Sequence, residues 1–277
     1  MSNKRYSNKG VNSAAKAQAR EAAAQESKRQ TLIVCAVAVA VILLAVVLAI
    51  VLGGTDATVG GGKDTTAGTT QTTTPSTSAP STSTVDMSAV KAEIDSMEVA
   101  DFTETTQTSE YVKITIKNFG DVVVRLRSDI APITVANFQK LVGEGFYNGL
   151  TFHRIMQGFM IQGGDPKGDG TGGSGTTIKG EFKINGIQND LSHVAGVISM
   201  ARRNTPYDSA TSQFFICNAD ASRSLDGSYA GFGYVVAGLD VVLTVSEVEV
   251  KANASGTENS VPVEPVVIEK ICFVTKN

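Results

Sequence analysis

A single arginine stands among aromatic, thioether and amide side chains in residues 152–165, Phe-His-Arg-Ile-Met-Gln-Gly-Phe-Met-Ile-Gln-Gly-Gly-Asp. A guanidinium keeps its proton at ordinary pH, so Arg154 can donate hydrogen bonds but cannot act as a general base. Strand alternation predicts that Phe152, Arg154 and Met156 share one face. This stretch alone would also suit a strand with a surface arginine, and the residues downstream decide between the two.

Three further stretches follow in order, at the spacing of one domain. They are GVISMAR at 196–202, SATSQFFIC at 209–217 and LDGSYAGFG at 225–233. Together with residues 152–165 this succession resembles the cyclophilins, and the resemblance extends from about Tyr111 to the C-terminus. It implies a peptidyl-prolyl cis-trans isomerase, which rotates the peptide bond before proline without a cofactor.

Rotation about that bond must break amide resonance, against a barrier of about 18–20 kcal/mol. As the amide twists, the prolyl nitrogen regains its lone pair, so a fixed donor favours the transition state over the planar ground state. The resemblance implies that Arg154 is this donor, and that Gln162 and Phe215 are catalytic with it. It implies substrate binding by the other matched residues, Phe159, Met160, Ala201, Arg202, Gln213, Leu225 and Tyr229.

Within the resemblance, the apolar members hold the proline ring, the two glutamines orient Arg154 and the substrate, and Ala201 and Arg202 align the peptide through their main chain. Two positions depart from the family's pattern. Ser224 stands where many members carry tryptophan, and the chain contains no tryptophan, which leaves open whether the family's cyclic peptide inhibitor binds. Tyr229 stands where histidine is common, and because it can pack on proline and donate a hydrogen bond, we expect turnover to survive.

Other chemistries find little support. The two histidines, His153 and His193, lack the Cys-x-x-Cys or His-x-x-x-His spacing of a zinc site, so no metal is expected. Residues 168–173 match G-x-G-x-x-G, but a strand-like run follows them instead of a phosphate-binding helix. With 24 Lys and Arg against 27 Asp and Glu in the chain, nucleic acid is not an expected partner.

The N-terminal region indicates where the protein works. Residues 32–52 form an unbroken apolar run, long enough at about 1.5 Å per residue to cross a hydrocarbon core of roughly 30 Å. A signal peptide has a shorter apolar region, so we predict an uncleaved transmembrane helix. Residues 1–31 are basic and Ala-rich, and positive residues stay in the cytoplasm. The chain should therefore be a single-pass protein of the cell membrane with its C-terminal domain outside.

Residues 53–85 consist mainly of Thr, Ser, Gly and Ala, a composition that predicts a disordered linker. The next segment, 86–108, is predicted to be a short amphipathic helix and a connector. Its first residue, Asp86, suits a helix N-cap. Apolar residues follow at helical spacing and are expected to pack on the downstream domain, namely Met87, Val90, Ile94 and Met97.

Residues 109–277 suffice for one packed domain. Alternating residues predict a hairpin around 118–120, and the patterns at 132–142 and 239–245 predict helices, with a closing strand at 266–274. Periodicity alone indicates a β-rich α+β fold. The resemblance implies a mostly β domain with two helices, in which a closed eight-stranded antiparallel barrel has its openings covered by the helices.

The resulting hypothesis is a membrane-anchored, monomeric prolyl isomerase that acts on proline-containing polypeptides and assists the folding of exported or surface proteins. The alternative is a proline-peptide-binding module or holdase chaperone that uses the same groove with little turnover. Arg154, Phe159, Gln162 and Phe215 together favour the enzyme, because binding alone needs no donor at the twisting nitrogen. A surface adhesion protein, suggested by the Thr-rich linker, would be expected to repeat its β-domain, and no repeat is visible.

Overall fold

The computed structural model describes residues 85–277. The predicted basic segment 1–31, the predicted transmembrane helix 32–52 and the predicted linker up to residue 84 lie outside the described residues. From residue 85 onward, no helix combines the length and the apolar character that crossing a membrane requires.

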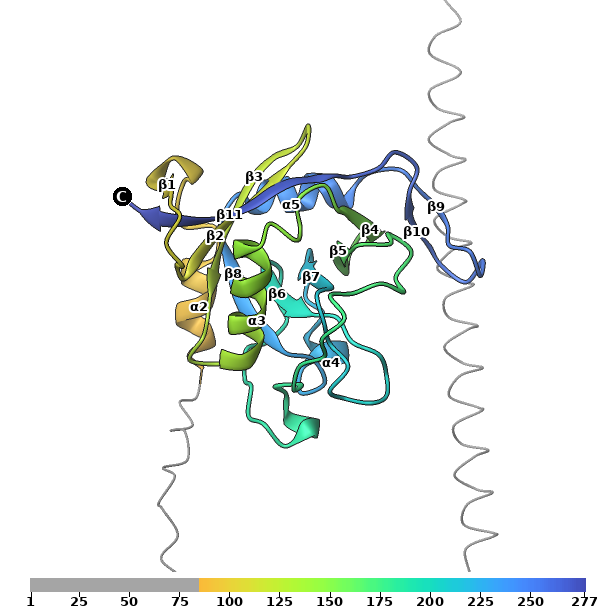
Figure 1. The fold of residues 1–277 in the computed structure, drawn as a ribbon, viewed down its shortest axis with the longest axis horizontal. Coiled ribbons are helices and arrows are strands. Elements are labelled where there is room, and N and C mark those ends of the chain that lie inside the picture. Colours follow the sequence, from red (N-terminus) through yellow and green to blue (C-terminus); the bar gives the residue numbers. More distant parts are fainter. Residues whose placement is uncertain (1–84) are drawn as a thin grey trace, which may run out of the picture. The chain divides into compact units, whose positions relative to one another are not determined.

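Strands make up most of the regular structure (Figure 1). The strands are β1 Phe102–Glu104, β2 Tyr111–Ile116, β3 Gly120–Leu126, β4 Thr151–Met156, β5 Met160–Asp165, β6 Val197–Met200, β7 Phe214–Cys217, β8 Gly231–Ala237, β9 Val250–Ala252, β10 Asn259–Pro262 and β11 Ile268–Lys276. The helices are α2 Met87–Glu93, α3 Pro132–Gly143, α4 Ser222–Leu225 and α5 Leu239–Ser246, with 3-10 turns η1 Val99–Asp101 and η2 Lys183–Asn185.

Nine strands form one antiparallel sheet in the order β1-β11-β2-β3-β8-β6-β7-β5-β4, and β9 and β10 form a separate hairpin. The expectation of a closed eight-stranded barrel is therefore wrong. On one edge of β11, the C-terminal end pairs with β1. On the same edge, β4 meets only the residues immediately before β11. That contact consists of an isolated bridge between Thr151 and Val267 and nearby backbone hydrogen bonds, so the sheet does not close as a continuous ladder.

The predicted local elements are confirmed where one face of an element is buried. The hairpin of β2 and β3 alternates buried with half-buried residues along β2. The helices expected at 132–142 and 239–245 are α3 and α5, and the closing strand is β11, displaced by about two residues. The one-turn helix α4 was not predicted.

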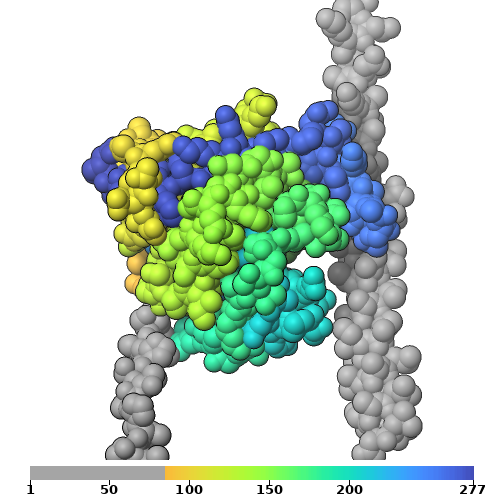
Figure 2. Space-filling model, in the orientation of Figure 1, coloured from red at the N-terminus to blue at the C-terminus, as the bar shows by residue number. Residues whose placement is uncertain are grey.

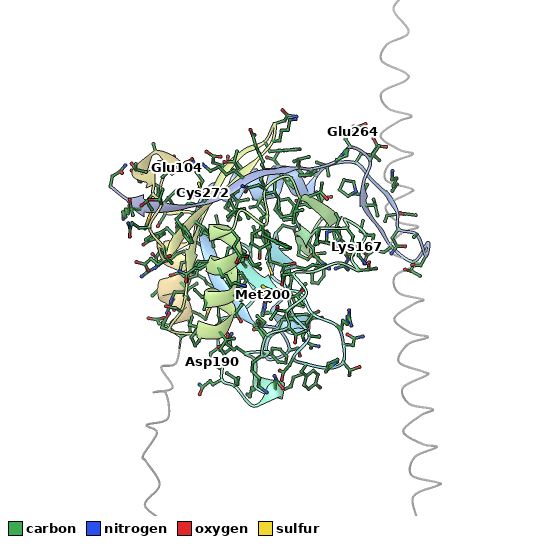
Figure 3. The ribbon with its side chains drawn as sticks, viewed as in Figure 1. Glu104, Lys167, Asp190, Met200, Glu264 and Cys272 are labelled. Atoms are coloured by element: carbon green, nitrogen blue, oxygen red, sulfur yellow. The ribbon has the colours of Figure 1, made fainter. Side chains whose placement is uncertain are left out.

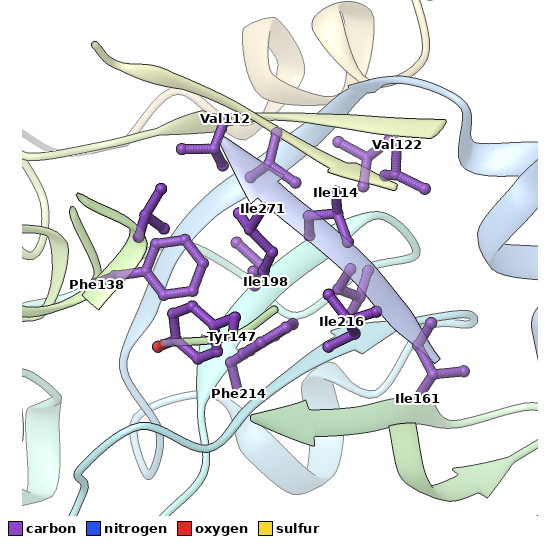
Figure 4. Close-up of a cluster of buried hydrophobic side chains, with 14 of the residues drawn as sticks. Val112, Ile114, Val122, Phe138, Tyr147, Ile161, Ile198, Phe214, Ile216 and Ile271 are labelled. Carbon is purple, nitrogen blue, oxygen red and sulfur yellow. The ribbon is translucent and has the colours of Figure 1, made fainter. Parts of the chain in front are cut away.

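The core lies between the sheet and α3. Phe138 of α3 inserts its ring against Tyr147 and Phe214, with ring centroids 5.1 and 5.6 Å away. Aliphatic side chains of the strands, including Ile114 and Ile271, complete the cluster (Figure 4). In the space-filling view, the atoms in the colour of α3 lie on the face turned to the viewer (Figure 2). Tilted and edge-on aromatic pairs add about 0.5–1.5 kcal/mol each beyond their burial. These pairs therefore stabilise the packing of α3 on the sheet.

The start of α3 is capped by a residue far away in the sequence. Pro132 occupies the first turn, and the N-cap position is Ala131, whose side chain cannot cap. The buried carboxylate of Glu181 instead accepts hydrogen bonds from the backbone N–H of Ile133 at 3.1 Å and of Thr134 at 2.8 Å. The Thr134 hydroxyl donates to the same carboxylate at 2.7 Å. Glu181 thus satisfies donors that a helix start leaves unpaired.

The segment 86–108 packs on the sheet, as the sequence predicts. Asp86 caps α2 by accepting from two backbone N–H groups, but α2 ends at Glu93, earlier than the apolar spacing suggested, and Asp95 adopts a φ of +53°. The Glu93 carboxylate accepts from Arg125 at 2.7 Å and from the Tyr234 hydroxyl at 2.6 Å. These bonds fix α2 to β3 and β8.

Candidate active site

Three neighbouring strands bring three of the predicted residues into one row. Arg154 on β4 lies opposite Gln162 on β5, and Gln162 lies opposite Phe215 on β7. Directly opposed residues of antiparallel strands point to the same face of a sheet. The row therefore joins a cation, an amide and an aromatic ring on one surface, although Phe215 follows Arg154 by many residues in the chain.

The prediction that Phe152 shares this face is wrong. The register of β4 against β5 shifts between Phe152 and Arg154, which leaves His153 as an extra residue in β4. A bulge of this kind reverses the alternation of side chains. Phe152 consequently points into the core, where its ring centroid lies 5.9 Å from that of Phe214, whereas Arg154 and Met156 remain together on the outer face.

The Arg154 guanidinium contacts four side chains. Its Nε and Nη2 donate to the two carboxylate oxygens of Glu258, each at 2.7 Å. Nη1 donates to Oε1 of Gln162 at 3.2 Å. The remaining contacts are to thioether sulfurs, Met156 at 3.2 Å and Met160 at 3.9 Å. The hydrogen bonds from Arg154 lower the pKa of Glu258, so its carboxylate is charged at neutral pH.

The two predicted glutamines form a relay behind the arginine. Nε2 of Gln162 donates to Oε1 of Gln213 at 2.9 Å. Nε2 of Gln213 donates to the backbone carbonyls of Gly170 and Gly172, at 3.1 and 2.8 Å. These bonds fix which end of each amide carries oxygen. The relay therefore presents the Gln162 oxygen to Arg154.

A small pocket of about 130 Å³ opens beside the guanidinium. The rings of Tyr229 and Phe215 are nearly perpendicular, with centroids 5.8 Å apart, and together they form one corner of the pocket. Nine of the ten predicted residues line the pocket, namely Arg154, Phe159, Met160, Gln162, Ala201, Arg202, Phe215, Leu225 and Tyr229. The tenth, Gln213, lines the neighbouring cavity.

That neighbouring cavity is larger, about 660 Å³, and it shares Gln162, Ala201 and Arg202 with the first. Its other lining residues come from the Gly-rich segment 167–177 and from residues 203–213. The match of 168–173 to a phosphate-binding pattern corresponds to a loop beside the pocket, and no helix follows it. The two cavities together make a cleft that can accept several residues of an extended chain.

Arg202 uses its side chain in a way that the sequence did not indicate. Its guanidinium lies over three rings, those of Phe182, Tyr207 and Tyr229, at 4.8, 5.1 and 4.7 Å from their centroids. Its Nε donates to the carbonyl of Ser228 at 2.9 Å. Cation–π contacts and this bond hold Arg202 as a fixed wall between the two cavities.

His193 packs against Phe215, one of the residues that line the pocket. Its ring stacks on Phe215 with centroids 6.1 Å apart, while its nitrogens contact Asp226 at 2.8 Å and the Ser199 hydroxyl at 3.0 Å. This order of groups resembles that of a serine hydrolase, but Ser199 is fully buried inside β6. A substrate cannot reach that hydroxyl, so the network is structural. Burial also lowers the pKa of His193.

Glu258 is the site residue that sequence reasoning missed. It precedes β10 and follows Arg154 by 104 positions, and no motif includes it. The only available signal was an acidic residue in a polar turn, which by itself indicates nothing about a partner.

A family model described as cyclophilin type peptidyl-prolyl cis-trans isomerase/CLD matches residues 111–272. The chain belongs to this family. A relative of this cyclophilin, peptidyl-prolyl cis-trans isomerase B of Bacillus subtilis (strain 168), is 46% identical over 135 residues, which are 49% of this chain and 90% of the relative. Peptidyl-prolyl cis-trans isomerase B of Escherichia coli (strain K12) is 41% identical over 161 residues, 56% of this chain and 94% of that protein.

Solved cyclophilins share the fold. The crystal structure of a Cryptosporidium parvum cyclophilin type peptidyl-prolyl cis-trans isomerase in the presence of the dipeptide Ala-Pro gives a TM-score of 0.51 at 29% identity, covering 59% of this chain and 98% of that one. The chain is thus a cyclophilin-type peptidyl-prolyl cis-trans isomerase. Because the family match begins at Tyr111, the elements α2, η1 and β1 precede the matched part.

Proposed function

We propose that the isomerase activity resides in the pocket beside Arg154, with the substrate proline on the Phe215 ring and the guanidinium donating to the prolyl nitrogen. One observation carries this assignment. Two N–H groups of Arg154 have only the thioether sulfurs of Met156 and Met160 as partners, and thioethers are weak acceptors. A twisted amide nitrogen, which has regained its lone pair, is a better partner than sulfur.

The expected gain from this bond is limited. A hydrogen bond from a charged donor contributes about 1.5–3 kcal/mol, which corresponds to roughly ten- to a hundred-fold in rate. The remainder must come from holding the peptide in position. In our proposal Phe159, Met160, Leu225 and Tyr229 hold the proline ring, Gln162 orients Arg154, and the peptide before proline extends past Ala201, Arg202 and Gln213 into the larger cavity.

The test is an isomerisation assay on the full-length chain, with a tetrapeptide that contains one Ala–Pro bond. Arg154→Ala should lower kcat/KM by about ten- to a hundred-fold. The matched control is Arg223→Ala, which removes an exposed arginine from α4 and should leave turnover unchanged. Full activity of Arg154→Ala would refute the assignment, and an inactive wild-type chain that still binds the peptide would favour a binding module.

We propose further that this isomerase works as a monomer at the outer face of the cell membrane, on proline-containing segments of exported or surface proteins. The support is the apolar run 32–52 preceded by the basic segment 1–31, which favours a cytoplasmic N-terminus. Protease added to intact cells should digest the domain from residue 85 onward, and complete protection of that domain would contradict this orientation.

A further inference from the structure

The β9–β10 hairpin brings a carboxylate against the arginine of the site. β10 lies beside β4, and Glu258 precedes β10 by one residue. Both oxygens of Glu258 accept from Arg154, at 2.7 Å to Nε and 2.7 Å to Nη2. This parallel two-bond arrangement fixes the guanidinium plane as well as its distance, because a planar carboxylate matches the planar fork of arginine.

The turn of the hairpin holds Glu258 in place. The backbone N–H of Asn253 donates to the carbonyl of Glu258 at 2.8 Å, and the Asn253 side-chain oxygen accepts from the backbone N–H of Thr257 at 3.1 Å. Gly256 completes the turn with a φ of +68°, a conformation that suits glycine. The hydrogen bonds of the turn therefore hold the backbone of Glu258 in place, and its side chain is only 23% exposed.

The five N–H groups of Arg154 divide into two sets. Glu258 takes Nε–H and one N–H of Nη2, and Gln162 takes one N–H of Nη1 at 3.2 Å. The other two point at the sulfurs of Met156 and Met160. Three bonds to oxygen, two of them short, thus hold the guanidinium, while the two N–H groups that face sulfur remain for a substrate.

Glu258 does not line the pocket, whereas Arg154 and Gln162 do. Its carboxylate occupies the Nε edge, and Gln162 holds the guanidinium at Nη1. We propose that Glu258 is a positioning residue for isomerisation, which acts through Arg154 by fixing the guanidinium with its free N–H groups toward the prolyl nitrogen. This inference rests on the role of Arg154 proposed above.

Without Glu258 the arginine would be anchored at one edge only. Its side chain is already one-third exposed, so the free guanidinium would rotate among several positions. Catalysis depends on the alignment of donor and nitrogen, and a displacement of about 1 Å in a reacting group can lower a rate by up to a hundred-fold. Substrate binding on the Phe215 ring would change less, because Glu258 does not contact the pocket.

The experiment measures kcat and KM of the full-length chain for the Ala–Pro tetrapeptide. Glu258→Ala should lower kcat by about ten-fold and change KM by less than about two-fold. Glu258→Gln should be intermediate, because its one remaining oxygen can keep one of the two bonds. The matched control is Glu264→Ala, which removes an exposed carboxylate from the connection between β10 and β11 (Figure 3) and should behave as wild type.

A double-mutant cycle separates positioning from a structural role. In the Arg154→Ala background, Glu258→Ala should cause no further loss of kcat, because the residue that it positions is absent. A kcat for Glu258→Ala equal to or above that of wild type would overturn the proposal, and so would an equal further loss in the Arg154→Ala background. If Arg154→Ala itself were fully active, the proposed function would fail instead.

Discussion

Glu181 should be among the most sensitive single positions of the domain outside the pocket. Its side chain lies buried against the start of α3, where it accepts three hydrogen bonds from Ile133 and Thr134. Glu181→Ala leaves two backbone N–H groups and one hydroxyl without their partner, and both groups of Thr134 lie in a fully buried residue. Each unsatisfied buried group costs about 1–3 kcal/mol. Allowing for partial rescue by water, we expect a loss of about 3–5 kcal/mol in the free energy of unfolding.

Urea unfolding of segment 85–277, followed by circular dichroism, measures this loss. With an m-value of about 2 kcal/mol per molar urea, the midpoint should fall by about 1.5–2.5 M. Two variants divide the effect among the bonds. Glu181→Gln keeps one acceptor oxygen and should lose about half as much, whereas Thr134→Val removes only the hydroxyl bond and should lose about 1 kcal/mol.

The loss should also appear locally, because α3 contacts the segment that leads into β7. Nδ2 of Asn137 donates to the carbonyl of Thr211 at 2.7 Å, two residues before Gln213. Because the Ile133 and Thr134 amides would lose their acceptor, their hydrogen exchange should accelerate in Glu181→Ala. A midpoint shift below about 0.5 M, within a few times the usual error, or unchanged exchange at these amides would refute the role of Glu181 as a helix cap.

Two further predictions concern pH and backbone strain. Lowering the pH from about 7.5 to about 5.5 should lower Tm. Histidines of the unfolded chain titrate near 6.5 and take up a proton in this range, whereas burial lowers the pKa of His193 in the folded chain, so acid favours the unfolded state. His193→Gln should make Tm less dependent on pH. Part of the dependence should remain, because burial also lowers the pKa of His153. An unchanged dependence of Tm on pH would show that His193 does not cause it. Gly164→Ala should lower Tm more than Gly158→Ala, because both have positive φ but only at Gly164 would the new Cβ lie 2.6 Å from the Ser212 carbonyl oxygen. Equal effects would rule out the collision.

Sequence patterns predicted the elements that bury one continuous face. The hairpin of β2 and β3, the helix from Pro132 to Gly143 and the helix beginning at Leu239 all follow the period of their backbone. The pocket was predicted for a different reason. The family's motifs specify side chains whose strands become neighbours, so Arg154, Gln162 and Phe215 could be assigned together although periodicity alone does not link them.

What the sequence did not reveal depends on backbone irregularity or on distant contacts. The bulge at His153 turns the Phe152 side chain into the core. A strict two-residue alternation read from the sequence assumes a regular strand, so it cannot predict where an extra residue interrupts it. The sheet does not close because β4 begins only at Thr151, and the residues before it form turns, so its antiparallel ladder cannot continue along β11 beyond the bridge to Val267. Glu181 and Glu258 meet partners 47 and 104 positions away, and a lone carboxylate in a loop has no signature of its partner.

The short strand β1 has a consequence for the behaviour of the protein in solution. It covers the C-terminal part of β11 with three residues, and its Glu104 pairs with Lys113 at 2.9 Å and Lys270 at 2.6 Å. An uncovered β11 would offer unpaired N–H and C=O groups to a second molecule. Fragments cut after β1 should therefore self-associate and precipitate, which makes residue 85, rather than residue 109, the proper beginning of a recombinant isomerase domain.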